Sequence, residues 1–318
     1  MRLLSAISII LFLSSINASK IEFDRYTIDD GLSQNTVYKV FQDSRGYIWL
    51  GTQGGLDRFN GYEFKHYEHE SNDSTSIVNG WIRAINEDED GLLWLGTVGG
   101  NLGWFDPYDE IGGEIDLFAD HPDFDRPGYI YDILFHGDYI FLTTLGSGLC
   151  RYNRKDGSTL WYSSDSTSKH YIKDRVFTNV YSISEDKILL GDRSIIILNT
   201  ETNEHVEPYN ELIEKEIGVP FDSIKVSSIT QTNDRKILIG TWSDHGLIIL
   251  DTESESVSQF FPLPPDPDSG KVPRTMIGEI TIDRFNKLWM PVFNVGLATF
   301  DMTEEEFELH LPDPKNPS

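Results

Sequence analysis

One short pattern recurs along the chain and constrains its fold more than any other feature. It begins with Asp, has Gly or Asn three residues later, and ends in an aliphatic residue followed by Trp. Clear copies occur at residues 43–49, 88–94 and 283–289. Gly and Asn tolerate the positive φ of a tight hairpin turn, and an Asp side chain can accept hydrogen bonds from turn amides. The pattern therefore predicts a hairpin turn that opens a β-strand.

Weaker copies fill the interval between the second and third clear ones. Residues 140–143, 188–191 and 237–240 take the place of residues 48–51. We call the last residue of this run the anchor. The six anchors follow one another at intervals of 45 to 51 residues and are Gly51, Gly96, Thr143, Gly191, Gly240 and Pro291. Six copies of one unit indicate a repeat architecture.

Each copy contains four strand-like pieces, which in the first copy are residues 37–41, the Trp-bearing strand, and residues 55–60 and 63–67. Four antiparallel strands in about 40–50 residues are typical of a β-propeller blade. We therefore predict an all-β propeller of four-stranded antiparallel blades over residues 20–318. Its six repeats run over residues 33–70, 77–119, 129–163, 176–209, 222–262 and 274–311. Only Asn210–Ile217 shows the apolar spacing of a helix.

The first copy resembles the two-component regulator propeller repeat in three segments, at residues 31–37, 43–52 and 55–61. That repeat builds the periplasmic sensor region of hybrid two-component histidine kinases of the Bacteroidetes type. The resemblance implies a non-catalytic sensor that binds a carbohydrate-derived ligand and passes a dimer rearrangement to a kinase. It also implies that this chain is the N-terminal fragment of such a kinase, with the enzymatic activity elsewhere in the parent protein.

Two segments bear on the number of blades. Residues 21–27 have the pattern of an outer strand. With this segment the chain would have seven outer strands, but only six sets of the three inner strands that complete a blade. The chain also ends, at residues 310–318, in what resembles an inter-blade loop. We therefore favour an incomplete seven-bladed ring. Because such a ring would expose unpaired strand edges, we expect its molecules to associate with one another. The alternative is a six-bladed ring in which residues 21–27 stay unpaired or add a fifth strand.

Charge and an apolar N-terminus bear on partners and location. The chain has 26 Lys and Arg residues against 52 Asp and Glu residues, a formal net charge of −26. Proteins that bind nucleic acid gain much of their affinity from cations, so we expect no nucleic-acid partner. Residues 3–16 have the length and apolar character of a signal-peptide core, and small residues follow. We expect residues 1–19 to be a signal peptide, the protein to be periplasmic or secreted, and no other membrane segment.

The sequence offers weak candidates for ligand binding. Loops between the second and third strands, and loops that enter the first strands, should gather at one mouth of the propeller channel, where aromatic faces can stack on sugar rings. The candidate ligand-binding residues are Gln53, Trp81, Trp242, His245 and Asn294. The residues to which we assign a structural role in the repeat are Trp49, Gly51, Trp94, Gly96, Gly191, Gly240 and Trp289.

No pattern indicates a catalytic residue, a metal or a cofactor. Residues 88–91 lack the ligand pattern of an EF-hand calcium loop and coincide with the repeat's turn. The histidines show no His-Glu-x-x-His arrangement, and residues 146–148 are not a nucleophile elbow. Cys150 is the only cysteine, which excludes an internal disulfide, and we expect it in the core.

We expect an oligosaccharide ligand and a homodimer as partners of this sensor. One alternative is a protein-interaction propeller without a small ligand. The other is a propeller-fold glycosidase or polysaccharide lyase, which would need charged groups at the mouth. The first two mouth loops, at residues 53–54 and 98–100, carry none.

Overall fold

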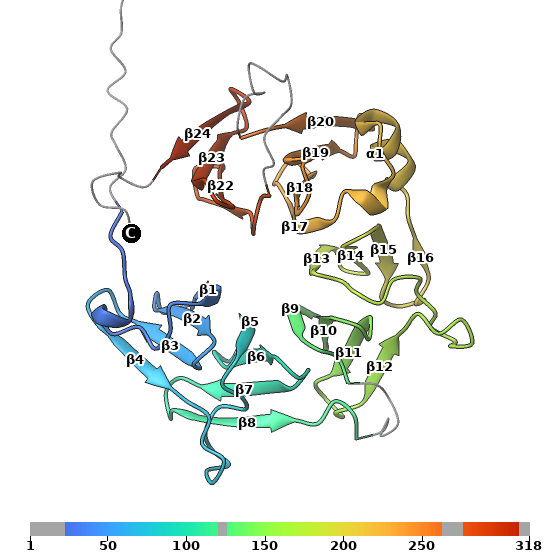
Figure 1. The fold of residues 1–318 in the computed structure, drawn as a ribbon. Helices are drawn as coiled ribbons and strands as arrows, with labels where there is room; N and C mark the ends of the chain where they lie inside the picture. Colours follow the sequence, from blue (N-terminus) through green and yellow to red (C-terminus); the bar gives the residue numbers. More distant parts are fainter. Residues whose placement is uncertain (1–22, 120–125, 263–275, 312–318) are drawn as a thin grey trace, which may run out of the picture.

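The computed structural model describes residues 23–119, 126–262 and 276–311. They form six sheets of four antiparallel strands, each built from consecutive strands. The sheets surround a central channel as the blades of a β-propeller, and the strands of each blade follow one another outward from the channel (Figure 1). The prediction of an all-β propeller with six four-stranded repeats is confirmed.

The strands of the first three blades are β1 (Val37–Gln42), β2 (Ile48–Thr52), β3 (Leu56–Phe59), β4 (Phe64–Tyr67), β5 (Ile82–Glu87), β6 (Leu93–Thr97), β7 (Leu102–Asp106), β8 (Ile111–Ile115), β9 (Ile130–His136), β10 (Tyr139–Thr144), β11 (Leu149–Asn153) and β12 (Thr159–Tyr162). The strands of the last three blades are β13 (Asn179–Ser184), β14 (Lys187–Gly191), β15 (Ile195–Asn199), β16 (His205–Val206), β17 (Val226–Gln231), β18 (Lys236–Thr241), β19 (Leu247–Asp251), β20 (Ser256–Phe260), β21 (Thr281–Ile282), β22 (Lys287–Val292), β23 (Gly296–Asp301) and β24 (Glu306–His310).

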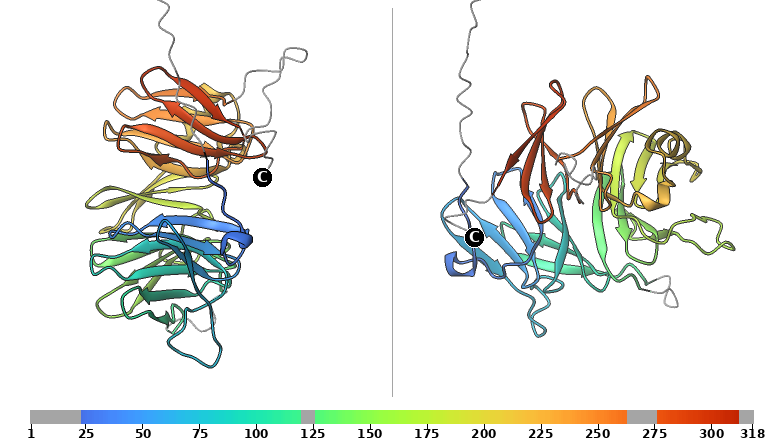
Figure 2. Two further views of the ribbon diagram at one scale, coloured as in Figure 1. Left: turned by 90° about the vertical axis from the view of Figure 1, so that its left-hand side faces the viewer. Right: turned by 45° about the horizontal axis from the view of Figure 1, so that its top comes forward.

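Short helices complete the described elements. Two are 3₁₀ helices, η1 (Ile28–Asp30) and η2 (Phe221–Ser223). The single α-helix, α1 (Asn210–Ile217), contacts β20 on the outside of the ring (Figure 2). Its bounds are those of the one stretch in which the sequence showed helical apolar spacing.

The turn between the first and second strands explains why Asp and Trp recur together. Asp43 Oδ1 accepts hydrogen bonds from the backbone N–H groups of Arg45 and Tyr47, at 3.0 and 2.9 Å. Asp43 Oδ2 accepts the indole N–H of Trp49 at 2.9 Å. The same indole–carboxylate bond joins Asp88 to Trp94 (2.8 Å) and Asp283 to Trp289 (2.9 Å). One carboxylate thus fixes both the hairpin turn and the large side chain that follows it.

The anchors lie where consecutive blades come closest. A Cβ on Gly96 would stand 2.6 Å from Cγ2 of Ile130, the residue that begins the first strand of the next blade. All six anchors pair with the beginning of the third strand of their own blade. The pairs are Gly51–Leu56, Gly96–Leu102, Thr143–Leu149, Gly191–Ile195, Gly240–Leu247 and Pro291–Leu297. The weak copies of the pattern are therefore structurally equivalent to the clear ones.

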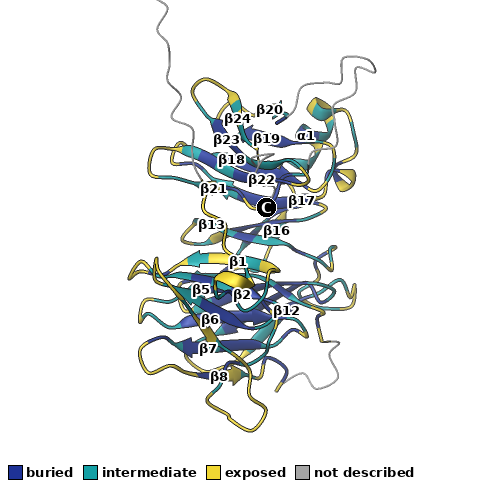
Figure 3. Ribbon diagram, turned by 60° about the vertical axis from the view of Figure 1, so that its left-hand side comes forward, coloured by how far each residue is buried: buried dark blue, intermediate teal, exposed yellow. Residues whose placement is uncertain are grey.

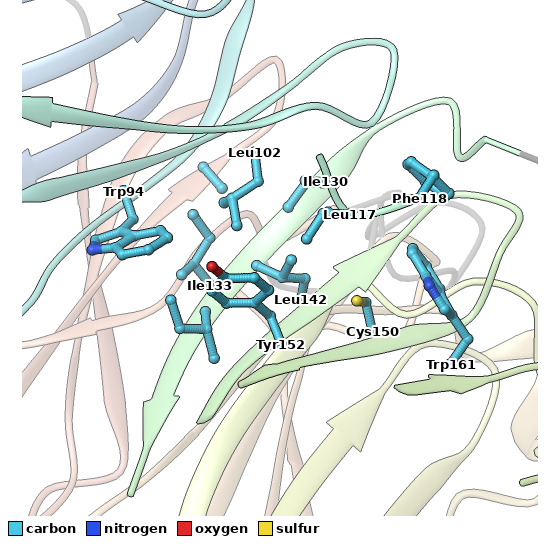
Figure 4. Packing of buried hydrophobic residues seen from close by; sticks show 12 residues of the cluster. Trp94, Leu102, Leu117, Phe118, Ile130, Ile133, Leu142, Cys150, Tyr152 and Trp161 are labelled. Carbon is cyan, nitrogen blue, oxygen red and sulfur yellow. The ribbon is translucent and has the colours of Figure 1, made fainter. Parts of the chain in front are cut away.

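The hydrophobic cores lie between neighbouring blades. Trp49 is fully buried, and its ring centroid lies 5.9 Å from that of Phe105 in the second blade. Trp94 and Cys150 belong to one core that the second and third blades share (Figure 4). Burial raises the pKa of the Cys150 thiol. An enclosed, neutral thiol is a packing residue rather than a nucleophile.

The junction between the sixth and first blades differs from the others. Ile85 and Ile133, the fourth residues of β5 and β9, are each 3% exposed, whereas Val40, the fourth residue of β1, is 60% exposed. Figure 3 shows the exposed stretches of β1 on this side of the ring. An ion pair between Lys39 Nζ and Glu279 Oε1, at 2.5 Å, links the two blades. Strand β1 therefore lacks the apolar cover that the preceding blade gives to β5 and β9.

The prediction of an outer strand at residues 21–27 is wrong for residues 23–27, the part of this segment that the structure describes. Residues 23–27 form no strand, and the ring of Tyr26 packs against Phe59 and Phe64, at 4.9 and 5.6 Å. Each described sheet takes its four strands from its own repeat. Residues 23–27 are therefore held by aromatic packing and not by strand pairing. The expected signal peptide and the end of the chain after residue 311 lie outside the described residues. Within the described ranges, no helix has the length and apolar character needed to span a membrane.

Candidate functional site

A repeated backbone contact shapes one end of the channel. In four blades, the residue two positions after the anchor donates its N–H to the carbonyl of the residue just before the first strand. In the sixth blade the acceptor is Met276, just before Ile277, which forms an isolated bridge with Val292. These bonds join Gln53 to Thr36 (3.3 Å), Val98 to Trp81 (3.1 Å), Leu145 to Tyr129 (3.0 Å), Trp242 to Lys225 (2.9 Å) and Phe293 to Met276 (3.0 Å). We call the end of the channel formed by these ten residues the loop mouth. The hairpins with the Asp–Trp bonds lie at the opposite end, because they follow the other ends of the first strands.

Two aromatic side chains from different blades meet at the loop mouth. Trp242, in the fifth blade, and Phe293, in the sixth, have ring centroids 5.0 Å apart. Trp242 is 40% exposed and Phe293 is 42% exposed. Large exposed rings held against each other form a flat apolar surface beside polar loop backbone, which suits the face of a sugar ring.

The other predicted binding residues are not part of this ring pair. Asn294 forms the turn itself, with a φ of 60°. The carbonyl of His245 accepts a hydrogen bond from Gln259 on β20, the outermost strand of its blade, at 3.0 Å, so His245 lies away from the channel. Trp81, in the second blade, is 38% exposed at the loop mouth, and Gln53 lies there in the first blade.

Sequence reasoning missed an arginine between tyrosines just inside the loop mouth. The guanidinium carbon of Arg83 lies 4.5 Å from the ring centroid of Tyr38, 4.7 Å from that of Tyr129 and 5.3 Å from that of Tyr131. Tyr38, Arg83 and Tyr131 are the second residues of β1, β5 and β9, the innermost strands of three successive blades. We call these four side chains the arginine cage. The sequence signal that could have revealed the cage is the equivalent position of Tyr38, Arg83 and Tyr131 in the first strands of successive repeats.

An acidic residue of the fourth blade, Asp192, lies at the same end of the channel as the arginine cage. Burial raises the pKa of Asp192 to about 6; the charges of Arg193 and Lys225 oppose this rise, and that of Asp174 adds to it. Burial also raises the pKa of Tyr131, where the charge of Arg83 opposes the rise and that of Asp192 adds to it. Asp192 follows β14 at the loop-mouth end of the channel, where its carbonyl accepts a hydrogen bond from the N–H of Val226, the first residue of β17, at 2.8 Å.

A second charged group lies deeper along the inner strands. Burial raises the pKa of Asp132 to about 6; the charge of Lys39 opposes this rise, and that of Glu279 adds to it. Burial acts to lower the pKa of Lys39, but the charges of Glu279 and Asp132 outweigh it and raise the value. These three residues come from the first, third and sixth blades. Lys39 forms its ion pair with Glu279, and its charge also acts on Asp132.

A Ser, an Asp and a His also come together, but in the wrong order for nucleophilic catalysis. The hydroxyl of Ser33 donates to Asp57 Oδ2 at 2.6 Å, and the ring of His66 bonds to Asp57 Oδ1. In a serine hydrolase the imidazole stands between the hydroxyl and the carboxylate and takes the proton. Here the buried carboxylate stands in the middle. The cluster therefore fixes the entry loop of the first blade and does not activate Ser33.

The opposite end of the channel holds a cavity of about 420 Å³ near the fifth and sixth blades. Its lining includes Gln231, Thr281 and Asp283. The Asp283 carboxylate already accepts the indole N–H of Trp289 and the backbone N–H groups of its own turn. This cavity lacks the exposed ring pair and the cationic group of the loop mouth. Among the described residues, no group of three or more His, Cys, Asp or Glu side chains is arranged to hold a metal ion.

Two comparisons at the level of sequence identify the repeats. The model of the two component regulator propeller family matches residues 31–54 and 76–99, which contain the first two clear copies of the pattern. Histidine kinase P4 from Formosa agariphila is 43% identical over 82 residues, which are 24% of this chain and 6% of that protein. The resemblance to two-component regulator propeller repeats is therefore confirmed, and the matched segment is a small part of a much longer relative.

Solved structures share the propeller fold at low identity. The extracellular domain of a protein described as a hybrid two component system, from B. thetaiotaomicron, has a TM-score of 0.72 and 20% identity over 93% of this chain and 37% of that chain. Virginiamycin B lyase from Staphylococcus aureus has a TM-score of 0.61 and 16% identity over 88% of this chain and 86% of that chain. The fold is thus common to the extracellular domain of a hybrid two component system and to a lyase, and function must be argued from the site.

Proposed function

We propose that this chain, whose first two blades carry two-component regulator propeller repeats, is the non-catalytic extracellular sensor part of a hybrid histidine kinase. Its ligand is a carbohydrate fragment bound at the loop mouth. The names of the relatives support the sensor role, and the apolar N-terminal run supports export to the periplasm or beyond. The observation that carries the site is the exposed ring pair of Trp242 and Phe293.

The ring pair also suggests how binding could become a signal. Trp242 and Phe293 belong to neighbouring blades, so a sugar that stacks on both rings restrains the junction between these blades. A ligand that binds one arrangement of the blades better than another shifts the population toward it by its difference in affinity. A dimer of sensors could pass such a shift to the kinase.

Calorimetric titration of the purified protein with a panel of neutral and acidic oligosaccharides tests the proposal. We expect at least one to bind, and Trp242→Ala and Phe293→Ala each to weaken binding about tenfold, because a lost aromatic contact costs ~1 kcal/mol or more. Tyr62→Ala is the matched control, since Tyr62 is 94% exposed in the turn between β3 and β4. Folded protein that binds no sugar but captures a protein partner would favour the interaction platform. Turnover of a glycan would favour an enzyme.

A further inference from the structure

We infer that the arginine cage is a receptor for a monoanionic acid group, a carboxylate or a sulfate ester, on the ligand. This inference rests on the proposed function and narrows its ligand to an acidic oligosaccharide. The cage is formed by side chains of the first three blades, so it is separate from the ring pair of the fifth and sixth blades.

The guanidinium of Arg83 is contacted by aromatic rings rather than by hydrogen-bond acceptors. A guanidinium has five N–H groups, all directed outward in its own plane. The tyrosine rings at 4.5 to 5.3 Å provide cation–π contact but accept none of these hydrogen bonds. In the described part of the chain, no side chain or carbonyl accepts a hydrogen bond from Arg83, and no carboxylate lies within 4.0 Å of it.

Two other arginines of the chain have oxygen acceptors for their guanidinium N–H groups. Arg151, which is similarly part-buried, donates to the carbonyl of Thr200 at 3.0 Å. Arg154 forms a two-fold hydrogen-bonded ion pair with Glu89. The chain has 52 acidic residues for 26 basic ones, so carboxylate partners are abundant. A part-buried arginine that faces tyrosines instead of a carboxylate leaves its donors available to a ligand.

The guanidinium N–H donors of Arg83 suit an acid group that presents two oxygens. Carboxylates and sulfate esters each present two oxygens that can accept parallel N–H bonds from one guanidinium. The hydroxyls of Tyr38, Tyr129 and Tyr131 can add donors, since a phenol donates readily to an anion. Asp192 lies at the same end of the channel, so a doubly charged group such as a phosphate monoester meets more repulsion there than a monoanion.

Matched ligand pairs test the inference. One pair is a uronic-acid oligosaccharide and its methyl ester; the other is a sulfated oligosaccharide and its desulfated form. Each pair is titrated calorimetrically into wild-type protein, Arg83→Gln and Arg83→Lys. The matched control is Arg284→Gln, because Arg284 makes a similar cation–π contact, 4.8 Å from Phe285, in an exposed hairpin at the opposite end of the channel. Thermal melting checks that every variant folds.

We expect wild-type protein to bind the acidic member of at least one pair about tenfold or more tightly than the neutral member, since a charge-assisted hydrogen bond contributes that much. Whichever pair shows the preference identifies the acid group. Arg83→Gln should remove the preference and keep the affinity for the neutral member. Arg83→Lys should keep part of the preference for the acidic member, because an ammonium keeps the positive charge but lacks the two parallel N–H donors of a guanidinium. Arg284→Gln should behave as wild type. An unchanged preference in Arg83→Gln overturns the inference and leaves the proposed function intact.

A second measurement keeps the inference testable if no oligosaccharide binds. Glucuronate and methyl sulfate are titrated separately while the Nε–H resonance of Arg83 is followed by NMR at constant ionic strength. We expect a saturable shift of the Arg83 signal with at least one anion and none of the Arg284 signal. Equal, non-saturable shifts of both signals would overturn the cage as an anion receptor. This result is independent of whether a sugar stacks on Trp242.

Discussion

The Asp43 carboxylate accepts two turn amides and the Trp49 indole, and its side chain is fully buried. Arg45 pairs with the same carboxylate at 3.3 Å. These contacts link a local turn to the Trp side chain that packs against the second blade. A single residue thus couples hairpin geometry to the packing between blades, which explains why Asp and Trp keep a fixed separation in the clear repeats.

Replacing Asp43 should therefore destabilise the whole protein. Asp43→Ala leaves the buried indole N–H and two turn amides without their acceptor, and we expect the free energy of unfolding to fall by roughly 2–4 kcal/mol. Urea denaturation measures it. Asp109→Ala, in an exposed hairpin, should change it by less than about 0.5 kcal/mol. Equal unfolding midpoints for the two variants would contradict this role of the turn carboxylate.

Asp192 should make stability depend on pH. Its pKa is about 6 in the folded state and 3.8 ordinarily, so the folded protein takes up this proton more readily than the unfolded chain. Ionised Asp192 therefore costs stability above pH 6, and the cost disappears as the pH falls from 7.5 toward 4. Arg193, Lys225 and Asp174 modulate the same carboxyl group.

We expect Asp192→Asn to raise the Tm at pH 7.5 and to lose this gain near pH 4.5, in thermal melts across that range. Asp109→Asn is the control for removing one negative charge. A gain that is the same at both pH values would show that charge repulsion in general, and not the buried carboxyl group, is responsible.

Sequence reasoning at this scale found part of the site. Trp242 stood out because it departs from the repeated Trp position. Phe293 and Arg83 did not stand out in the sequence, because the rings that they contact belong to other blades. Which positions of different blades face one another becomes clear only once the strand register is known. Register fixes which residues of different repeats face one another, and a single sequence does not contain it.

At the scale of elements, the anchor glycines set the approach between blades. A Cβ on Gly96 would stand 2.6 Å from Ile130 Cγ2 and 3.0 Å from the Ala84 Cβ, closer than packed carbon atoms come. Gly96→Ala must therefore push the second and third blades apart, and we expect a loss of roughly 1–3 kcal/mol in the free energy of unfolding. Gly80→Ala, whose Cβ would meet nothing within 4 Å, is the control. Similar unfolding curves for both variants would contradict the close approach.

The elements themselves were largely readable from the sequence. Their repetition, with Gly or Asn at turns and a constant spacing, predicted four strands per copy even where Trp was lost. The error at residues 21–27 has a physical cause. Apolar and polar residues alternate over residues 21–24, as in an outer strand, but each sheet already has four strands from its own repeat. The rings of Phe23 and Tyr26 pack instead against side chains of the sixth and first blades.

At the scale of the whole molecule, the exposed face of β1 should promote association. Val40 is 60% exposed at a position that is buried in β5 and β9, so the protein presents an apolar strand face at the junction with the sixth blade. We expect concentration-dependent self-association in size-exclusion chromatography coupled to light scattering. Val40→Glu should reduce it, and Val206→Glu, at an exposed position on β16, should not. A heat-stable wild-type monomer at all concentrations would contradict this expectation.

We expect the ligand to bind at the loop mouth, and a crystal structure of the protein with the tightest-binding oligosaccharide tests this most directly. We predict a sugar ring against Trp242 and Phe293, and an acid group within hydrogen-bond distance of Arg83. Sugar bound instead in the cavity at the opposite end, beside Gln231 and Thr281, would contradict the account.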